Sequence, residues 1–138
     1  MILEDIEWQK RLTPEQFQVL RLKGTEIPGS GALLNNNEAG VYRCAACHAV
    51  VFESDAKYDT HTPGLIGWPS FSSAANKGAI EIKQDNSAGM QRLEAVCSNC
   101  GGHLGHLFDD RSSPNGKHYC INSVSLEFEP DHSLNKGK

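Results

Sequence analysis

The first 24 residues carry the features of two short helices. In the first segment acidic residues come early and basic residues late, which is the order that the helix dipole favours. A second helix is expected after Thr13, because Pro14 suits the first helical position and Gln16, three residues after the cap, completes a capping box. Gly24 is a plausible C-terminal stop. We therefore predict a helical cap over residues 1–24.

After residue 24 the apolar segments become short and rich in β-branched and aromatic residues, and turn residues separate them. In the last segment Val124, Leu126 and Phe128 alternate with polar residues, as in a half-buried strand. The pattern predicts one mainly antiparallel β domain over about 40–130, followed by a frayed tail over 131–138. The segments predicted as strands are 41–44, 50–52, 80–83, 93–97, 118–121 and 124–129.

Composition narrows the class of protein. The chain has 138 residues, 38% of them hydrophobic and 22% charged, which suits a single globular domain spanning 1–138. A formal net charge of -4 argues against binding to nucleic acid or to an anionic membrane. No apolar run approaches the roughly 18–20 residues that cross a bilayer, and the N-terminus lacks a secretory h-region. We expect a cytoplasmic monomer.

Four of the five cysteines form two C-x2-C pairs. Cys44 and Cys47 make the first pair, Cys97 and Cys100 make the second, and 49 residues separate the pairs. Two such turns can complete a tetrahedral shell of four thiolates, which leaves no open position and makes the ion structural. Zinc is the default occupant, although iron suits the same geometry. We predict one structural metal ion that joins distant parts of the sheet.

Other uses of these residues remain open at this stage. A C-x2-C pair can be a thioredoxin-like redox centre, but neither pair here lies in a βαβ pattern. His48 and His103 lie next to the two turns and could replace a cysteine as ligands. An exposed loop position is the simpler interpretation of His48.

The fifth cysteine, Cys120, is the remaining candidate for chemistry. A lone strand cysteine is often a small buried hydrophobe, so its composition alone does not indicate a nucleophile. However, the sequence also holds a histidine pair, His103 and His106, and an aromatic loop with Trp68 and Phe71. A thiol, a proton donor and an aromatic wall together indicate a redox or acyl-transfer site.

These motifs together resemble those of a known family. CxxC, GWPSF, CxxCGGHLGHxFxD and YCINS occur in this order from about Leu12 to about Pro130, which is similar to the methionine-R-sulfoxide reductases, the MsrB family. The resemblance implies two antiparallel sheets with short N-terminal helices and a four-cysteine zinc site remote from the catalytic centre. It also implies reduction of the R epimer of methionine sulfoxide, especially in oxidised proteins, with thioredoxin as the usual reductant.

The resemblance assigns roles to individual residues. Cys120 matches the nucleophile, His103 and His106 match two active-site histidines, Asn122 a substrate-orienting amide, and Trp68 the wall that receives the substrate methyl group. An imidazolium could protonate the sulfoxide oxygen and would favour the thiolate form of the nucleophile. The products would be methionine and a cysteine sulfenic acid. A further aromatic residue of the GWPSF motif, Phe71, could line the substrate pocket or fill the core beneath it.

Two positions depart from the family pattern. Ile66 stands where many members carry a resolving cysteine, so we expect the sulfenic acid to be reduced directly by thioredoxin or a small thiol. His118 stands where an arginine is usual, which would make the reactivity of Cys120 more dependent on pH. Asp109 and Asp110 could orient a histidine or could lie in a solvated loop.

Two other classes of protein compete with the reductase. A non-enzymatic four-cysteine module for protein interaction needs the metal and the sheet, but it has no use for Cys120, two histidines and Trp68 together. A zinc-ribbon nucleic-acid binder is disfavoured by the negative charge and by the lack of a basic strand interleaved with aromatic residues.

Overall fold

The computed structural model describes residues 5–22, 24–27, 29, 31–58, 60, 66–76, 78–86 and 91–130. The first four residues of the predicted helical cap and the predicted tail over 131–138 lie outside the described residues. No helix in the described part of the chain is both long enough and apolar enough to cross a membrane.

The two predicted helices are α1, Asp5–Arg11, and α2, Pro14–Leu20. The capping box at the start of α2 is confirmed, because Gln16 N donates to Thr13 Oγ1 at 3.1 Å and Thr13 N donates to Gln16 Oε1 at 2.9 Å. The helix ends before Gly24, with Arg21 as its C-cap. Gly24 nevertheless closes the turn, since its N–H donates to the carbonyl of Gln18 at 2.9 Å.

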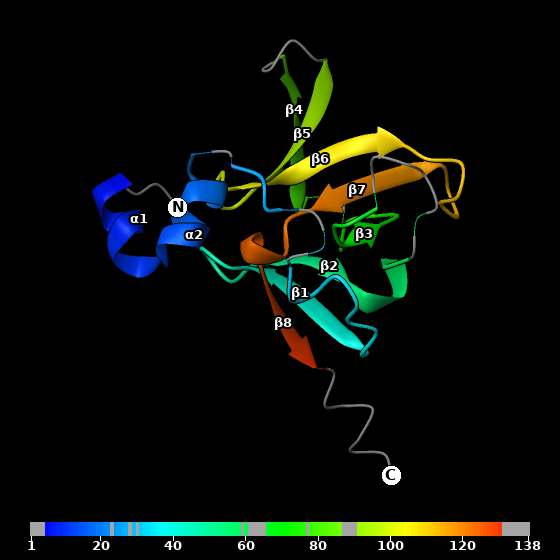
Figure 1. Cartoon of the computed structure of the whole chain (residues 1–138), viewed down its shortest axis with the longest axis horizontal. Helices are drawn as coiled ribbons and strands as arrows, with labels where there is room; N and C mark the ends of the chain where they lie inside the picture. The colour runs from blue at the N-terminus through cyan, green and yellow to red at the C-terminus, as the bar shows by residue number, and fades with distance from the viewer. Residues whose placement is uncertain are drawn as a thin grey trace.

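In the described part of the chain eight strands form two antiparallel sheets, so the prediction of a mainly β fold is confirmed (Figure 1). The smaller sheet has the order β2-β1-β8 and the larger one the order β3-β7-β6-β5-β4. The two helices lie beside the sheets at one side of the molecule (Figure 1). The strands are β1 Gly40–Cys44, β2 Val50–Glu53, β3 Ser70–Phe71, β4 Ile80–Asp85, β5 Arg92–Cys97, β6 His103–Asp109, β7 Lys117–Ile121 and β8 Leu126–Pro130.

Two strands were missed and one began later than predicted. The sequence analysis did not predict β3 or β6, and β6 contains Gly105 in its interior, which usually weakens a strand. The last strand begins at Leu126, because Ser123–Ser125 forms a 3-10 turn, η3, before it. Val124 therefore does not belong to the alternating strand pattern.

An aromatic cluster joins the two sheets. Phe71 of the larger sheet stacks on Phe52 of the smaller one, with ring centroids 4.4 Å apart, and meets Tyr42 edge-on at 5.0 Å. Phe52 also meets Tyr119 of β7 at 5.5 Å. Phe71 is fully buried and does not line the cavity described below, which supports the alternative that it fills the core over a substrate-binding role. Its large apolar ring contributes to packing between the sheets and not to the site.

The helices cover the end of the sheets where the cysteines lie. Trp8 of α1 and Leu20 of α2 are both 1% exposed and belong to the same hydrophobic core as the strands. Arg21 lies over the ring of Trp8 at 5.4 Å, and its Nη1 donates to the carbonyl of Cys100 at 3.3 Å. This contact ties the helical cap to the second C-x2-C turn.

Candidate metal centre and thiol site

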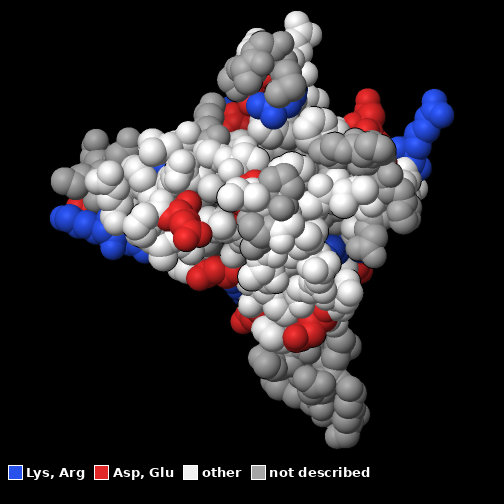
Figure 2. Space-filling model, viewed as in Figure 1, with Lys and Arg blue, Asp and Glu red and all other residues white. Residues whose placement is uncertain are grey.

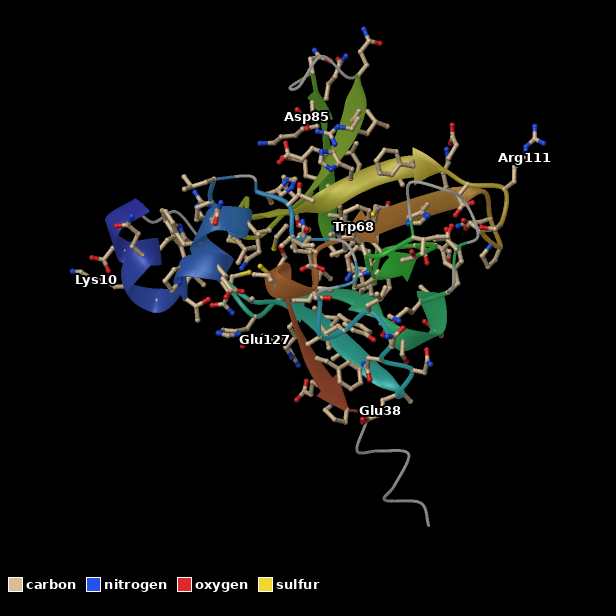
Figure 3. All side chains as sticks on the ribbon, viewed as in Figure 1. Lys10, Glu38, Trp68, Asp85, Arg111 and Glu127 are labelled. Atoms are coloured by element: carbon tan, nitrogen blue, oxygen red, sulfur yellow. The ribbon has the colours of Figure 1, made fainter. Side chains whose placement is uncertain are left out.

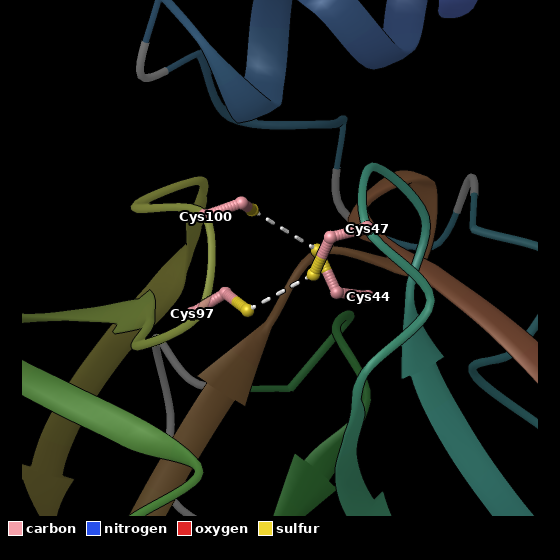
Figure 4. Close-up of side chains that lie close together, drawn as sticks. All are labelled: Cys44, Cys47, Cys97 and Cys100. Carbon is pink, nitrogen blue, oxygen red and sulfur yellow. Dashed lines mark hydrogen bonds between the residues drawn. The ribbon is translucent and has the colours of Figure 1, made fainter. Parts of the chain in front are cut away.

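The four paired cysteines converge on one point between the two sheets (Figure 4). Cys44 ends β1 and Cys97 ends β5, while Cys47 and Cys100 lie in the turns that follow these strands. All four Sγ atoms lie within 4.8 Å of one another. The Sγ atoms of Cys44 and Cys100 are 3.7 Å apart, and those of Cys47 and Cys97 are 3.5 Å apart.

This geometry fits a tetrahedral metal ion. Zinc–sulfur bonds of about 2.3 Å give sulfur–sulfur edges of about 3.8 Å, close to the separations found here. Contact with neighbouring thiols lowers the pKa of Cys47 to about 6, through its hydrogen bond with Cys44, and raises the pKa of Cys44, through its hydrogen bond with Cys100. The thiols therefore share protons that a dication would replace. The fold thus brings together the predicted four-cysteine set.

Neither neighbouring histidine takes a ligand position in this cluster. His48 is an exposed loop residue, as expected, and its Nδ1 contacts Glu127 Oε1 at 2.7 Å. His103 is buried, and its Nδ1 lies 2.7 Å from Glu94 Oε2. The alternatives in which a histidine replaces a cysteine are not supported.

Cys120 lines a separate cavity of about 110 Å³. Four of the predicted site residues line it together, namely Cys120, His106, Asn122 and Trp68. Its other described lining residues are Thr25, Arg92, Gly105 and Phe108. The larger sheet and the two loops that carry Thr25 and Trp68 therefore assemble one site from distant parts of the chain.

The register between β6 and β7 places the histidine opposite the thiol. In the antiparallel pairing His106 lies directly across from Cys120, so their side chains point to the same face of the sheet. A Cβ atom at Gly105 would collide with the carbonyl of Cys120, so only glycine permits this close approach of the strands. Gly105 makes β6 hard to predict from sequence, yet the pairing of β6 with β7 requires a glycine at this position.

An aspartate at the end of β4 holds His106 and a cation together. His106 Nε2 lies 2.8 Å from Asp85 Oδ2, and Arg92 Nη2 lies 3.4 Å from the same oxygen. A carboxylate can only accept, so Nε2 of His106 carries its hydrogen and Nδ1 is the atom left for proton transfer. Asp85 lies near the top of the view, at the end of β4, whereas Trp68 lies near the centre of the molecule (Figure 3).

The second predicted histidine, His103, packs against His106 outside the cavity. His103 does not line the cavity; it meets His106 edge-on, with ring centroids 5.3 Å apart. Its partner Glu94 is also buried, at 1% exposure, so a buried carboxylate is matched by a buried hydrogen-bond donor. We interpret His103 as a positioning residue for His106.

Glu26 organises the opposite wall of the cavity. Its carbonyl accepts from Trp68 Nε1 at 3.1 Å, and its N–H donates to Asn122 Oδ1 at 3.0 Å. Asn122 also donates from Nδ2 to the carbonyl of Leu104 at 3.1 Å. An amide nitrogen carries two hydrogens, so one remains for a ligand in the cavity. The indole and the amide are therefore held in place before any substrate arrives.

The resting site does not ionise the thiol. Burial, followed by the charge of Glu26, raises the pKa of Cys120 to about 12. The expectation that a neighbouring imidazolium favours the thiolate was therefore wrong for the ligand-free protein, because desolvation disfavours the charged form. Cys120 is a thiol at neutral pH until a substrate changes its surroundings.

His118 shares the sheet face of Cys120, two residues before it. Its ring is fully buried, its Nδ1 lies 2.8 Å from Asp110 Oδ2, and burial lowers its pKa below the ordinary value. Asp110 also accepts from Tyr58 at 2.7 Å, so it orients a histidine, whereas Asp109 is exposed. His118 is thus neutral at pH 7 and supplies no permanent cation beside the thiol.

Several residues of the site were not found by sequence reasoning. Among those that line the cavity these are Thr25, Arg92 and Phe108, and Asp85 and Glu94 hold the two histidines. Glu94 lies in the predicted strand 93–97, and Arg92 lies one residue before it, on the same face of β5. A search of this segment for charged residues on one face could have found both. No local pattern in the sequence marks Thr25 or Asp85. Thr25 reaches the cavity from a loop, and Asp85 lies near His106 because β4 pairs with β5.

Comparison with known proteins supports the same family that the motifs indicated. The SelR domain matches residues 12–130 of this chain. A peptide methionine sulfoxide reductase MsrB from Methanosarcina barkeri is 52% identical over 132 residues, covering 96% of this chain and 90% of the relative. The corresponding protein of Leptospira interrogans is 50% identical over 127 residues, covering 92% and 94%.

A human relative matches over much of its length as well. Methionine-R-sulfoxide reductase B2, mitochondrial, from Homo sapiens is 51% identical over 131 residues, covering 90% of this chain and 70% of the relative. Sequence identity of about half to these relatives, over nearly the whole chain, agrees with the geometry of the Cys120 site described above. The chain therefore belongs to the SelR-domain family of methionine-R-sulfoxide reductases.

Proposed function

We propose that this reductase works through attack of Cys120 Sγ on the sulfur of methionine-R-sulfoxide. The observation that carries the proposal is the cavity in which the thiol, His106, Asn122 and Trp68 meet. An interaction module that does no chemistry would have no need for this arrangement, and family membership sets that alternative aside.

The cavity suits the end of a side chain. At about 110 Å³ it is much smaller than the roughly 300–1,000 Å³ that encloses a whole small-molecule ligand. We therefore propose that oxidised proteins are the main substrates, with the sulfoxide inserted and the polypeptide outside. The face of Trp68 receives the S-methyl group, and the amide of Asn122 orients the sulfoxide oxygen.

The balance of protons in the reaction assigns a role to His106. Attack forms a bond between Cys120 Sγ and the substrate sulfur, and the sulfur–oxygen bond of the substrate breaks only if the oxygen is protonated, because oxide is a poor leaving group. The oxygen leaves as water and then adds to Cys120 Sγ, which breaks the sulfur–sulfur bond and releases methionine. His106 supplies the proton to the substrate oxygen from Nδ1 and recovers the one that Cys120 loses. The sulfoxide is reduced to methionine, Cys120 is oxidised to the sulfenic acid, and the thiol hydrogen ends on the sulfenic oxygen.

Substitution of Cys120 should abolish turnover while leaving the fold intact. We expect Cys120→Ser to reduce no detectable methionine-R-sulfoxide, since a hydroxyl cannot take up the oxygen in this way. The wild-type protein should reduce the R epimer and leave the S epimer unchanged. An assay with separated epimers and dithiothreitol checks both expectations. Reduction of the S epimer, or activity that survives the substitution, would contradict the proposal.

The sulfenic acid has no obvious partner within the chain. The sequence contains five cysteines, four of which form the metal cluster, and Ile66 near Trp68 is 58% exposed where a resolving cysteine is usual. We propose that an external dithiol such as thioredoxin, or a small thiol, reduces Cys120 directly. A cytoplasmic location and a monomeric state remain predictions.

Oxidation by substrate alone should leave a sulfenic acid on Cys120. When the protein reacts with methionine-R-sulfoxide without a reductant, we expect one methionine per chain and a dimedone adduct on Cys120. Mass spectrometry of the digested protein identifies the adduct, and Cys120→Ser serves as the control without one. An internal disulfide formed in stoichiometric yield would refute direct recycling.

The four-cysteine cluster, on this proposal, holds zinc. Four thiolates from two turns form a closed shell, so the ion has a structural role and takes no part in catalysis. It would join the ends of β1 and β5, which belong to different sheets. In this way the ion would complement the aromatic cluster between the sheets.

Loss of one ligand should cost the metal and the stability of the fold. We expect one zinc ion per chain in the wild-type protein and little zinc in Cys44→Ser. The Tm of the variant should fall by roughly 10 °C or more, because the free energy of metal binding at a structural site contributes directly to the free energy of folding. Elemental analysis and thermal unfolding measure both. Cys120→Ser is the matched control and should keep its zinc. Iron in place of zinc would correct the metal, and an unchanged Tm in Cys44→Ser would contradict the structural role.

The raised pKa of Cys120 predicts slow alkylation of the resting protein. Below a pKa of about 12 the thiolate fraction rises about tenfold per pH unit, so reaction with iodoacetamide should accelerate through pH 10 without a plateau. An ordinary thiol such as N-acetylcysteine levels off above its own pKa near 9. Alkylation of Cys120 is followed by mass spectrometry, with Cys120→Ser as the blank. A plateau near pH 7 would show that the resting site holds a thiolate.

A further inference from the structure

A second hollow adjoins the Cys120 cavity. It has a volume of about 680 Å³ and lies between α2, residues 25–27, 31 and 32, and η3. Thr25 lines both the cavity and this hollow, so the two lie next to each other at this residue. We call it the Glu15 groove, after Glu15 on the first turn of α2. The groove is large enough for a stretch of polypeptide beside the residue whose side chain enters the cavity.

The groove is acidic. Of the described residues that line it, Glu15 and Glu26 are acidic and none is basic. On the face in view, acidic side chains gather over α2, and the basic side chains of that part lie further out along α1 (Figure 2). Glu15 is exposed and therefore accessible to a ligand.

Glu26 adds a buried carboxylate to the groove wall. It is 8% exposed; its Oε1 accepts from the N–H of Val124 at 3.0 Å, whereas its Oε2 is buried without a hydrogen-bond partner among the described residues. A Cβ atom at Gly31 would collide with Oε2 and with Ser123 Oγ, so a glycine is needed for this carboxylate to pack against the segment that carries residue 31. A buried carboxylate oxygen without a donor is unfavourable, and a cationic ligand would relieve it.

Apolar residues of the groove suit the stem of a long basic side chain. Ile27 is 75% exposed and Val19 forms part of the buried floor. Lysine and arginine lay their methylene stems along apolar surface and place the charged end at a polar group. An acidic side chain entering the same groove would meet two carboxylates of like charge.

We infer that the Glu15 groove binds the stretch of substrate polypeptide next to the methionine sulfoxide and selects a lysine or arginine there. This inference rests on the proposal that the substrates are oxidised proteins. Because the groove leaves the cavity in one direction, the basic residue is favoured on one flank of the sulfoxide only. Glu15 determines specificity and takes no part in the reduction itself.

Peptides that differ only in one flanking residue test the inference. Five-residue, end-blocked peptides carry methionine-R-sulfoxide in the centre and Lys, Ala or Glu on either side. At low salt we expect kcat/KM for the Lys peptide to exceed that for the Glu peptide by about two- to fivefold on one flank, as for a solvent-accessible ion pair. The ratio should fall towards one at about 1 M NaCl, where the Debye length is about 3 Å.

Matched variants separate the groove from general charge effects. Glu15→Gln should lower the ratio, with Glu26 as the remaining acidic side chain of the groove, and Glu15→Lys should lower it further, while both keep the wild-type kcat for the Ala peptide. Glu38→Gln removes an exposed charge far from Trp68 and should keep the wild-type ratio (Figure 3). Glu26 is not substituted, because its backbone and carboxylate hold the site together.

The outcomes of these experiments test the groove separately from the proposal that oxidised proteins are the main substrates. Equal kcat/KM for Lys and Glu peptides in the wild-type protein, or an unchanged ratio in Glu15→Gln, overturns the groove alone. Reduction of free methionine-R-sulfoxide without turnover of any peptide overturns both the groove and the preference for protein substrates.

Discussion

The pairing of β6 with β7 places His106 across from Cys120, and the remaining site residues are arranged around this register. The pairing depends on Gly105, because any side chain there would meet the carbonyl of the partner strand. A shift by one residue would turn the histidine to the opposite face of the sheet, where the core lies. The chemistry thus depends on a backbone contact as much as on the side chains that react.

Buried ionisable groups on this sheet face come in pairs. His103 lies against Glu94, His106 against Asp85, and His118 against Asp110, each with a nitrogen–oxygen distance of 2.7–2.8 Å. Removing one partner from such a pair leaves an uncompensated buried group, which is costly. The pairs therefore fix the orientation of each ring, and at His106, which lines the cavity, this leaves Nδ1 for a ligand.

The cysteine cluster and the thiol site occupy different ends of the same strand. Arg92 begins β5 at the cavity, and Cys97 ends it at the cluster. A strand rises about 3.3 Å per residue, which separates these residues by roughly 17 Å. A metal ion bound by the cluster would thus hold the two sheets together at a distance from Cys120.

The sequence alone determined the division of the cysteines, because spacing within a C-x2-C turn is a local property. It also determined the helix start at Thr13 and most strands, where capping and alternation act over a few residues. Tertiary structure decided the rest. It placed Phe71 in the core, made Cys120 a protonated thiol by burying it, and recruited Glu26 from a distant loop. These outcomes depend on desolvation and on contacts between segments far apart in the chain, which no local pattern encodes.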